Sequence, residues 1–194
     1  MLRKNDDRDI LVAKFEIEYE ETFHMKNLYK LIKEWLDVEN FADEIDKPKT
    51  EFEHLYFERI NMSGSKELYI WWRAVQVPKK NSYYRYVLKI DYQTLNMKST
   101  EVMHQGLKFK TDKGDLIMRI DAWLQLDYQN TWKDHPILKH FDRWYRRRIY
   151  KNKIELLKVD LYKIAYRLNN TIKQYLRLKT SYDMPKPFHP EKGI

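Results

Sequence analysis

The sequence predicts an α+β protein in which a curved antiparallel sheet of about six strands packs on a long C-terminal helix that extends beyond it. Two observations lead to this fold class. Apolar and polar residues alternate over most of residues 51–127, which is typical of half-buried strands joined by short turns. Residues 136–180 then contain no glycine and no proline after Pro136, so one helix can run through them. The predicted element order is one strand, a helical region, five strands and the final helix.

The first strand is predicted over residues 10–21, where apolar side chains alternate with charged ones. Its regularly spaced carboxylates, Glu16, Glu18 and Glu20, indicate the solvent face of a strand and not a metal site. Residues 25–36 change to helical spacing, with apolar residues at i, i+3, i+4, i+7 and i+8. We expect one or two further helical turns, reaching Ile45, before Pro48 ends the helical region.

Five strands are predicted next, over residues 51–60, 67–77, 82–92, 100–111 and 115–127. Turn-forming residues separate them at 62–65, 78–81, 94–98 and 112–114. Connections this short join antiparallel neighbours. Gly106 suggests a bulge within the fourth of these strands. The last strand has a continuous apolar face that we assign to the core: Leu116, Met118, Ile120, Ala122, Leu124 and Leu126.

The long helix is predicted to start at Asp134–Pro136, where a carboxylate precedes a proline suited to the first helical turn. Its apolar stripe changes sides near Ile149. Either the helix breaks around Tyr150–Asn152, or it is straight and its first half packs against one part of the structure while its second half packs against another. Because no glycine or proline marks a break, the straight helix is favoured, with the sheet on its first half.

An apolar seam with spacings of three and four residues continues beyond that half, and it predicts a homodimer. The predicted interface residues are Ile154, Leu157, Leu161, Ile164 and Leu168. The expected organisation is a sheet region over residues 1–135, the helix over 136–180 with its distal half as an oligomerisation segment, and a proline-rich tail over 181–194.

Positive charge is concentrated in the final helix. Residues 137–180 contain thirteen lysines and arginines against three acids, a net charge of +10, whereas the whole chain carries +8. Arginine suits bidentate contact with phosphate, so this concentration predicts binding to RNA or a ribonucleoprotein. The predicted binding residues are Arg143, Arg146, Arg147, Arg148, Lys151 and Lys153. A merely solvated charged face is the open alternative. Arg119 and Trp123, on the outer face of the last strand, are a weaker candidate for base stacking.

Several chemistries find no support. The chain has no cysteine, its six histidines lack metal-ligand spacing, and none of its serines sits in a glycine-flanked nucleophile elbow. No cofactor is expected, and a non-catalytic role is favoured without excluding an enzyme. With no signal-peptide pattern and no run of eighteen apolar residues, we expect a cytoplasmic protein without a transmembrane segment.

In element order, residues 10–168 resemble the helix-grip fold of the START and birch-pollen-allergen-like superfamily. In that fold a curved antiparallel sheet wraps around a long final helix. The resemblance implies a cavity between sheet and helix for an apolar or amphipathic small molecule, and hence an alternative function as a carrier or sensor. It transfers no binding residue, because no sequence motif of the superfamily is present.

Overall fold

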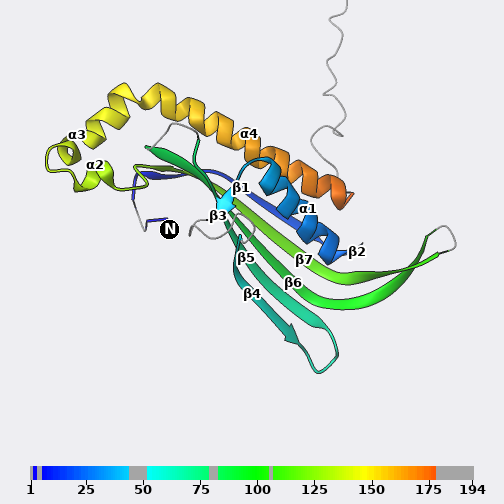
Figure 1. The fold of residues 1–194 in the computed structure, drawn as a ribbon. Coiled ribbons are helices and arrows are strands. Elements are labelled where there is room, and N and C mark those ends of the chain that lie inside the picture. The colour runs from blue at the N-terminus through cyan, green and yellow to red at the C-terminus, as the bar shows by residue number, and fades with distance from the viewer. Residues whose placement is uncertain (1, 4–5, 44–51, 79–82, 105–106, 178–194) are drawn as a thin grey trace, which may run out of the picture.

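The computed structural model describes residues 2–3, 6–43, 52–78, 83–104 and 107–177. It is an α+β fold with one curved antiparallel sheet and a C-terminal helical region that extends beyond it, as predicted (Figure 1). The strands are β1 (Asp9–Tyr19), β2 (Thr22–Phe23), β3 (Ala42–Asp43), β4 (Glu53–Ile60), β5 (Lys66–Gln76), β6 (Tyr84–His104) and β7 (Leu107–Leu126). The helices are α1 (Met25–Val38), α2 (Thr131–Asp134), α3 (Leu138–Trp144), the π-helical turn η1 (Tyr145–Ile149) and α4 (Lys151–Tyr175).

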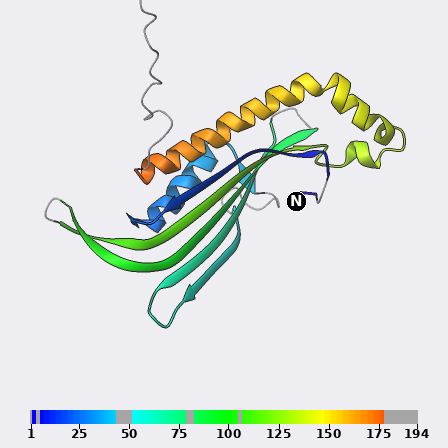
Figure 2. The same cartoon turned by 180° about the vertical axis from the view of Figure 1, so that it is seen from behind.

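The sheet has the order β1-β7-β6-β5, and β5 carries both β3 and β4 along its other edge. β2 pairs with β7 beyond the end of β1. Helices α1 and α4 lie on the same face of the sheet, and α3 projects past the sheet end (Figures 1 and 2). One layer of helices therefore covers one layer of strands.

The structure has two long strands, β6 and β7, where three strands were predicted. The turns predicted at residues 94–98 and 112–114 are wrong, because the chain continues as a strand through both segments. Those segments lie opposite each other within the β6–β7 pair, where the register shifts between Leu95 and Lys98. Asn96 adopts a left-handed conformation with φ 51°. A Cβ on Gly114 would lie 2.7 Å from the Met97 Cα, so only glycine fits opposite this bulge. The residues predicted to form turns therefore form a bulge inside one hairpin. Gly106, where a bulge was predicted, lies outside the described residues.

The core lies between the sheet and the two long helices. The predicted inner face of β7 is confirmed, since every one of its apolar side chains from Leu116 to Leu126 is fully buried. Three fully buried α1 residues, Leu28, Ile32 and Leu36, belong to the same core cluster. Helix α1 ends earlier than predicted, because Asn40 turns left-handed with φ 59° and the chain re-enters the sheet as β3.

The final helix is broken, so the favoured straight helix is wrong and the break at Tyr150 is confirmed. Tyr150 N–H donates to the Tyr145 carbonyl at 2.9 Å, an i to i+5 bond that closes the π-helical turn. The helical region starts near the predicted place: His135 Nδ1 accepts from the backbone N–H of Ile137 and Leu138 at 3.2 Å each, and α3 begins at Leu138.

The packing of the two halves is the reverse of the prediction. The sheet covers α4, the second half, while the first half lies beyond the sheet. The predicted interface residues Ile154, Leu157, Leu161 and Leu168 are buried within the chain's own core, at most 7% exposed, and Ile164 packs against it. The seam is therefore not available as the predicted dimer interface.

Candidate functional site

The segment formed by α3 and η1, residues 138–149, is called the arm here. Its exposed cations continue into the first turn of α4. Five of the six predicted nucleic-acid-binding side chains are solvent-exposed: Arg143, Arg147, Arg148, Lys151 and Lys153. Within the described part of the chain, none of these five forms an ion pair. The arm and the start of α4 thus carry unneutralised positive charge beyond the end of the sheet.

Arg146, the sixth predicted residue, has a different role. Its side chain is only 10% exposed, with Nη2 3.0 Å from Asp142 Oδ2 and 3.1 Å from Asp7 Oδ1. Its Nη1 also donates to the Asp7 carbonyl at 3.2 Å. Arg146 therefore ties the arm to the N-terminal segment and is not available to a phosphate.

The inner face of the arm is polar and aromatic. Asp142 is 8% exposed and accepts a hydrogen bond from the Tyr83 hydroxyl at 3.2 Å. Burial, followed by the charge of Asp142, raises the pKa of Tyr83 well above its usual range. These contacts fix the arm against the start of the long hairpin.

The π-helical turn has a packing reason. Residues five apart in an α-helix point about 140° away from each other, because the helix has 3.6 residues per turn. The wider turn brings Tyr145 and Tyr150 to one side, where their rings stack with centroids 5.5 Å apart. Both rings meet Tyr83 edge-on, at 6.0 and 5.3 Å, and Trp132 completes the cluster at 4.6 Å from Tyr145. The change of sides that the sequence showed near Ile149 is this turn.

The outer side of the arm also carries apolar side chains. Four large ones are between 55% and 63% exposed: Phe141, Trp144 and Ile149 of the arm, and Ile137 just before it. The sequence placed the early apolar stripe against the sheet, and that interpretation is wrong. The missed signal is the pair Asp142 and Arg146, whose i, i+4 spacing favours an ion pair on one helix face. That pair, and not the apolar stripe, marks the inner side.

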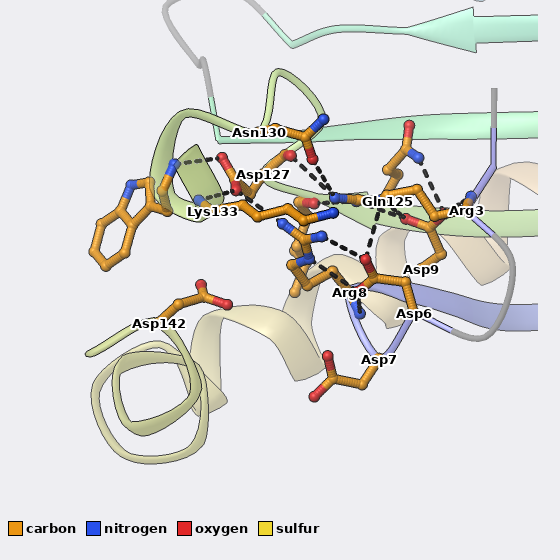
Figure 3. Close-up of polar contacts among 12 residues, drawn as sticks. Arg3, Asp6, Asp7, Arg8, Asp9, Gln125, Asp127, Asn130, Lys133 and Asp142 are labelled. Atoms are coloured by element: carbon orange, nitrogen blue, oxygen red, sulfur yellow. Dashed lines mark hydrogen bonds and ion pairs between the residues drawn. The ribbon is translucent and has the colours of Figure 1, made fainter. Parts of the chain in front are cut away.

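Beside the base of the arm lies a buried charged network (Figure 3). Arg8 Nη1 is 3.1 Å from Asp127 Oδ2, and Arg3 Nη2 is 2.7 Å from Asp9 Oδ1. The hydrogen bond from Arg8 to Asp6 lowers the pKa of Asp6 well below its usual range. Asp127 also accepts from the backbone N–H of Trp132 and Lys133, at 3.0 and 3.1 Å, and so caps α2. The sequence pattern indicated no role for these N-terminal residues, because the Asp127 carboxylate that pairs with Arg8 lies 119 positions away along the chain.

The outer-face sheet residues that suggested base stacking are engaged. Arg119 Nε donates to Glu16 Oε1 at 2.8 Å, and Lys89 lies over the Trp123 ring at 5.5 Å. Arg73, on the same face, pairs with Asp91 at 2.5 Å. These three outer-face cations therefore already have partners.

A cleft that the sequence did not predict lies under α1, on the helix side of the sheet. It is a cleft of about 770 Å³ between α1 and the strands β4, β5, β6 and β7. Its buried apolar lining comes from Met25, Leu68, Ile70 and Met97, and lysines of α1 stand along it. The face of α4 toward the sheet is packed instead, since Leu161, Leu168 and Ile172 are fully buried.

No cluster of three or more histidine, aspartate or glutamate side chains that could hold a metal ion occurs among the described residues. No helix in the described ranges is both long and apolar enough to cross a lipid bilayer.

Comparison with known proteins adds little. The chain matches no protein-family profile and no curated protein sequence. Among solved structures it is similar to an uncharacterized protein from Rhizobium leguminosarum, at 8% sequence identity and a TM-score of 0.20. That match covers 87% of this chain and 96% of the other. At this TM-score the likeness supports no inference about function.

Proposed function

We propose that this protein is a non-catalytic binding protein that contacts structured RNA, alone or within a ribonucleoprotein, through the arm and the first turn of α4. The observation that carries the proposal is a group of five exposed cations that have no acidic partner among the described residues: Arg143, Arg147, Arg148, Lys151 and Lys153. Unneutralised cations on a fixed element release counterions when they bind a phosphate backbone.

Two features of the arm support this function. The ion pair of Arg146 and the aromatic cluster around Tyr83 hold the arm in place, so that little conformational entropy is lost on binding. The neighbouring exposed rings of Phe141 and Trp144 are able to stack on unpaired bases. The cations extend along the chain beyond these rings. This spacing suits contact with several consecutive phosphates of an RNA backbone.

The test is the salt dependence of RNA binding. Arg143, Arg147 and Arg148 are changed together to glutamine, and affinity for a long hairpin RNA with an unpaired loop is measured between low and physiological salt. Each lost phosphate contact lowers the slope of log affinity against log salt by about 0.7 to 0.9. We expect the triple variant to lose about two to three units of slope.

The matched control changes three exposed cations elsewhere, Lys14, Arg59 and Lys163, to glutamine. This variant has the same net charge as the arm variant, and its salt slope is expected to change by less than one unit. No RNA binding by the unmodified protein, or equal slopes for the two triple variants, overturns the proposal. So does stronger binding to vesicles containing phosphatidylserine than to RNA, because exposed apolar residues beside arginines also suit a lipid surface.

The helix-grip resemblance and the predicted homodimer remain proposals. A homodimer requires a surface other than the buried α4 seam. A carrier holding its ligand against α4 requires the packed residues Leu161 and Leu168 to separate from the sheet, so the filled interface favours the RNA-binding function over that alternative.

A further inference from the structure

The cleft under α1 combines an apolar floor with positive charge. Met25, Leu68, Ile70 and Met97 are between 1% and 7% exposed, and they line its inner side. Lys26, Lys30 and Lys33 line it from α1. Their spacing of i, i+4 and i+7 places all three on one face of the helix. A volume of about 770 Å³ falls within the usual range for small-molecule sites.

The carboxylates in the cleft already have partners. Glu58 Oε1 pairs with Lys66 Nζ at 2.8 Å, and its Oε2 accepts from the Tyr56 hydroxyl at 3.2 Å. Asp112 Oδ2 accepts from the Met25 backbone N–H at 3.3 Å, at the start of α1. Among the described residues, Lys26, Lys30 and Lys33 form no ion pair. The three α1 lysines therefore give the cleft an excess of positive charge.

Two buried polar atoms without a hydrogen-bond partner among the described residues lie behind the lining of the cleft. Tyr29 lines the cleft and meets the Trp72 ring edge-on at 4.6 Å, and Tyr92 lies 5.3 Å beyond Trp72. Trp72 Nε1 and Tyr92 Oη are buried and have no hydrogen-bond partner among the described residues. Tyr92 is also the direct β-sheet neighbour of the cleft residue Ile70. Unsatisfied buried donors of this kind are rare in folded proteins.

The bulge in the long hairpin shapes this site. It turns Met97 toward the cleft, where that side chain is 6% exposed, while its neighbours Asn96 and Lys98 face solvent. The backbone of the bulge closes on Gly114, so the feature that bends the hairpin also supplies part of the apolar floor.

We propose that the cleft under α1 binds a single-tailed amphipathic anion, whose apolar tail lies on Met25, Leu68, Ile70 and Met97 and whose head group lies among the α1 lysines. The tail matches the buried apolar lining, and a carboxylate or phosphate head matches the unpaired lysines. This proposal is independent of RNA binding by the arm, because the two sites share no residue.

The test uses dodecanoate and dodecyl phosphate, below their micelle concentrations, with the protein labelled at its methionine methyl groups. Binding in the cleft shifts the NMR signals of Met25 and Met97, whereas Met103 is exposed on the hairpin away from the cleft and serves as an internal control. Dodecyltrimethylammonium has the same tail with a cationic head. We expect it to bind at least about tenfold more weakly.

Changing Lys30 and Lys33 to glutamine is expected to weaken dodecanoate binding roughly three- to tenfold, the effect of two partly exposed charge contacts. The matched control, Lys14→Gln with Lys163→Gln, is expected to change it by less than about twofold. Ser99→Trp, at an exposed position lining the cleft, is expected to abolish binding without unfolding the protein. Whichever of dodecanoate and dodecyl phosphate binds more tightly shows whether the cleft prefers a carboxylate or a phosphate head group.

Three results overturn the proposal: no shift of Met25 and Met97 with either anion, an equal shift of Met103, or equal affinity for the cationic amphiphile. The arm variant, in which Arg143, Arg147 and Arg148 are changed to glutamine, is expected to bind dodecanoate as tightly as the unmodified protein does. Failure of one proposal is thus separable from failure of the other.

Discussion

Helix α4 and the arm belong to one continuous basic stretch of sequence, and they are packed in opposite ways. Helix α4 buries the apolar seam that includes Leu157 and Leu161 and leaves its charges in water. The arm buries Asp142 and most of Arg146 and leaves Phe141 and Trp144 exposed. The difference shows that an apolar stripe is buried only where another element can cover it. At the arm the charged network and the aromatic cluster determine the inner side.

The largest effect is expected from the α4 seam. Leu161→Ala removes a fully buried side chain and should lower the free energy of unfolding by about 2 to 5 kcal/mol. Leu156→Ala makes the same change on the same helix at a side chain that is 60% exposed, so we expect less than about 0.5 kcal/mol. Urea denaturation measures both. Equal losses would mean that the seam is not core.

The next largest effect is expected at the tie between the arm and the N-terminal segment. Arg146→Gln removes the ion pairs to Asp142 and Asp7 and should cost about 1 to 3 kcal/mol of stability, because hydrogen bonds to charged groups are lost at a partly buried site. Arg147→Gln, at an exposed neighbouring position, is the control, with an expected change below about 0.5 kcal/mol. If both substitutions behave alike in thermal denaturation, Arg146 belongs with the exposed cations.

A smaller effect should appear in the pH dependence. The pKa of Asp6 is lowered in the folded state by its hydrogen bond from Arg8, so its stabilisation is present above the unfolded pKa of about 4 and is lost as the pH falls below it. We expect Asp6→Asn to lower stability at pH 7 and to approach the unmodified protein near pH 2. Asp134→Asn, at an exposed position, is the reference. A constant difference between Asp6→Asn and the unmodified protein across this range would contradict the interpretation.

The smallest effect on stability is expected at the outer face of the arm. Replacing Phe141 and Trp144 together with serine should change the melting temperature by less than about 2 °C, because both side chains are more than half exposed. Differential scanning calorimetry measures this, and RNA binding by the same variant reports whether the rings stack on bases. A large drop in melting temperature would place them in a core and remove the contrast between the arm and α4.

The sequence alone determined the fold class, the inner face of β7, the start of the helical region and the concentration of positive charge within it. These properties follow from local periodicity and composition. The residues at 94–98 and 112–114 show the limit of such reasoning: a left-handed Asn96 and a Gly114 suit a turn and a bulge equally well, and only pairing across the hairpin distinguishes them.

The tertiary structure decided which half of the final helix is buried, and so which predicted residues remain available for binding. Arg146 and Arg147 are neighbours of the same type, yet the first pairs with Asp7, 139 positions earlier, and the second faces solvent. The cleft under α1 likewise requires a helix, four strands and a bulge to come together. Contacts between residues far apart in the chain leave no periodic pattern in the sequence, because each partner is set by where the other elements pack.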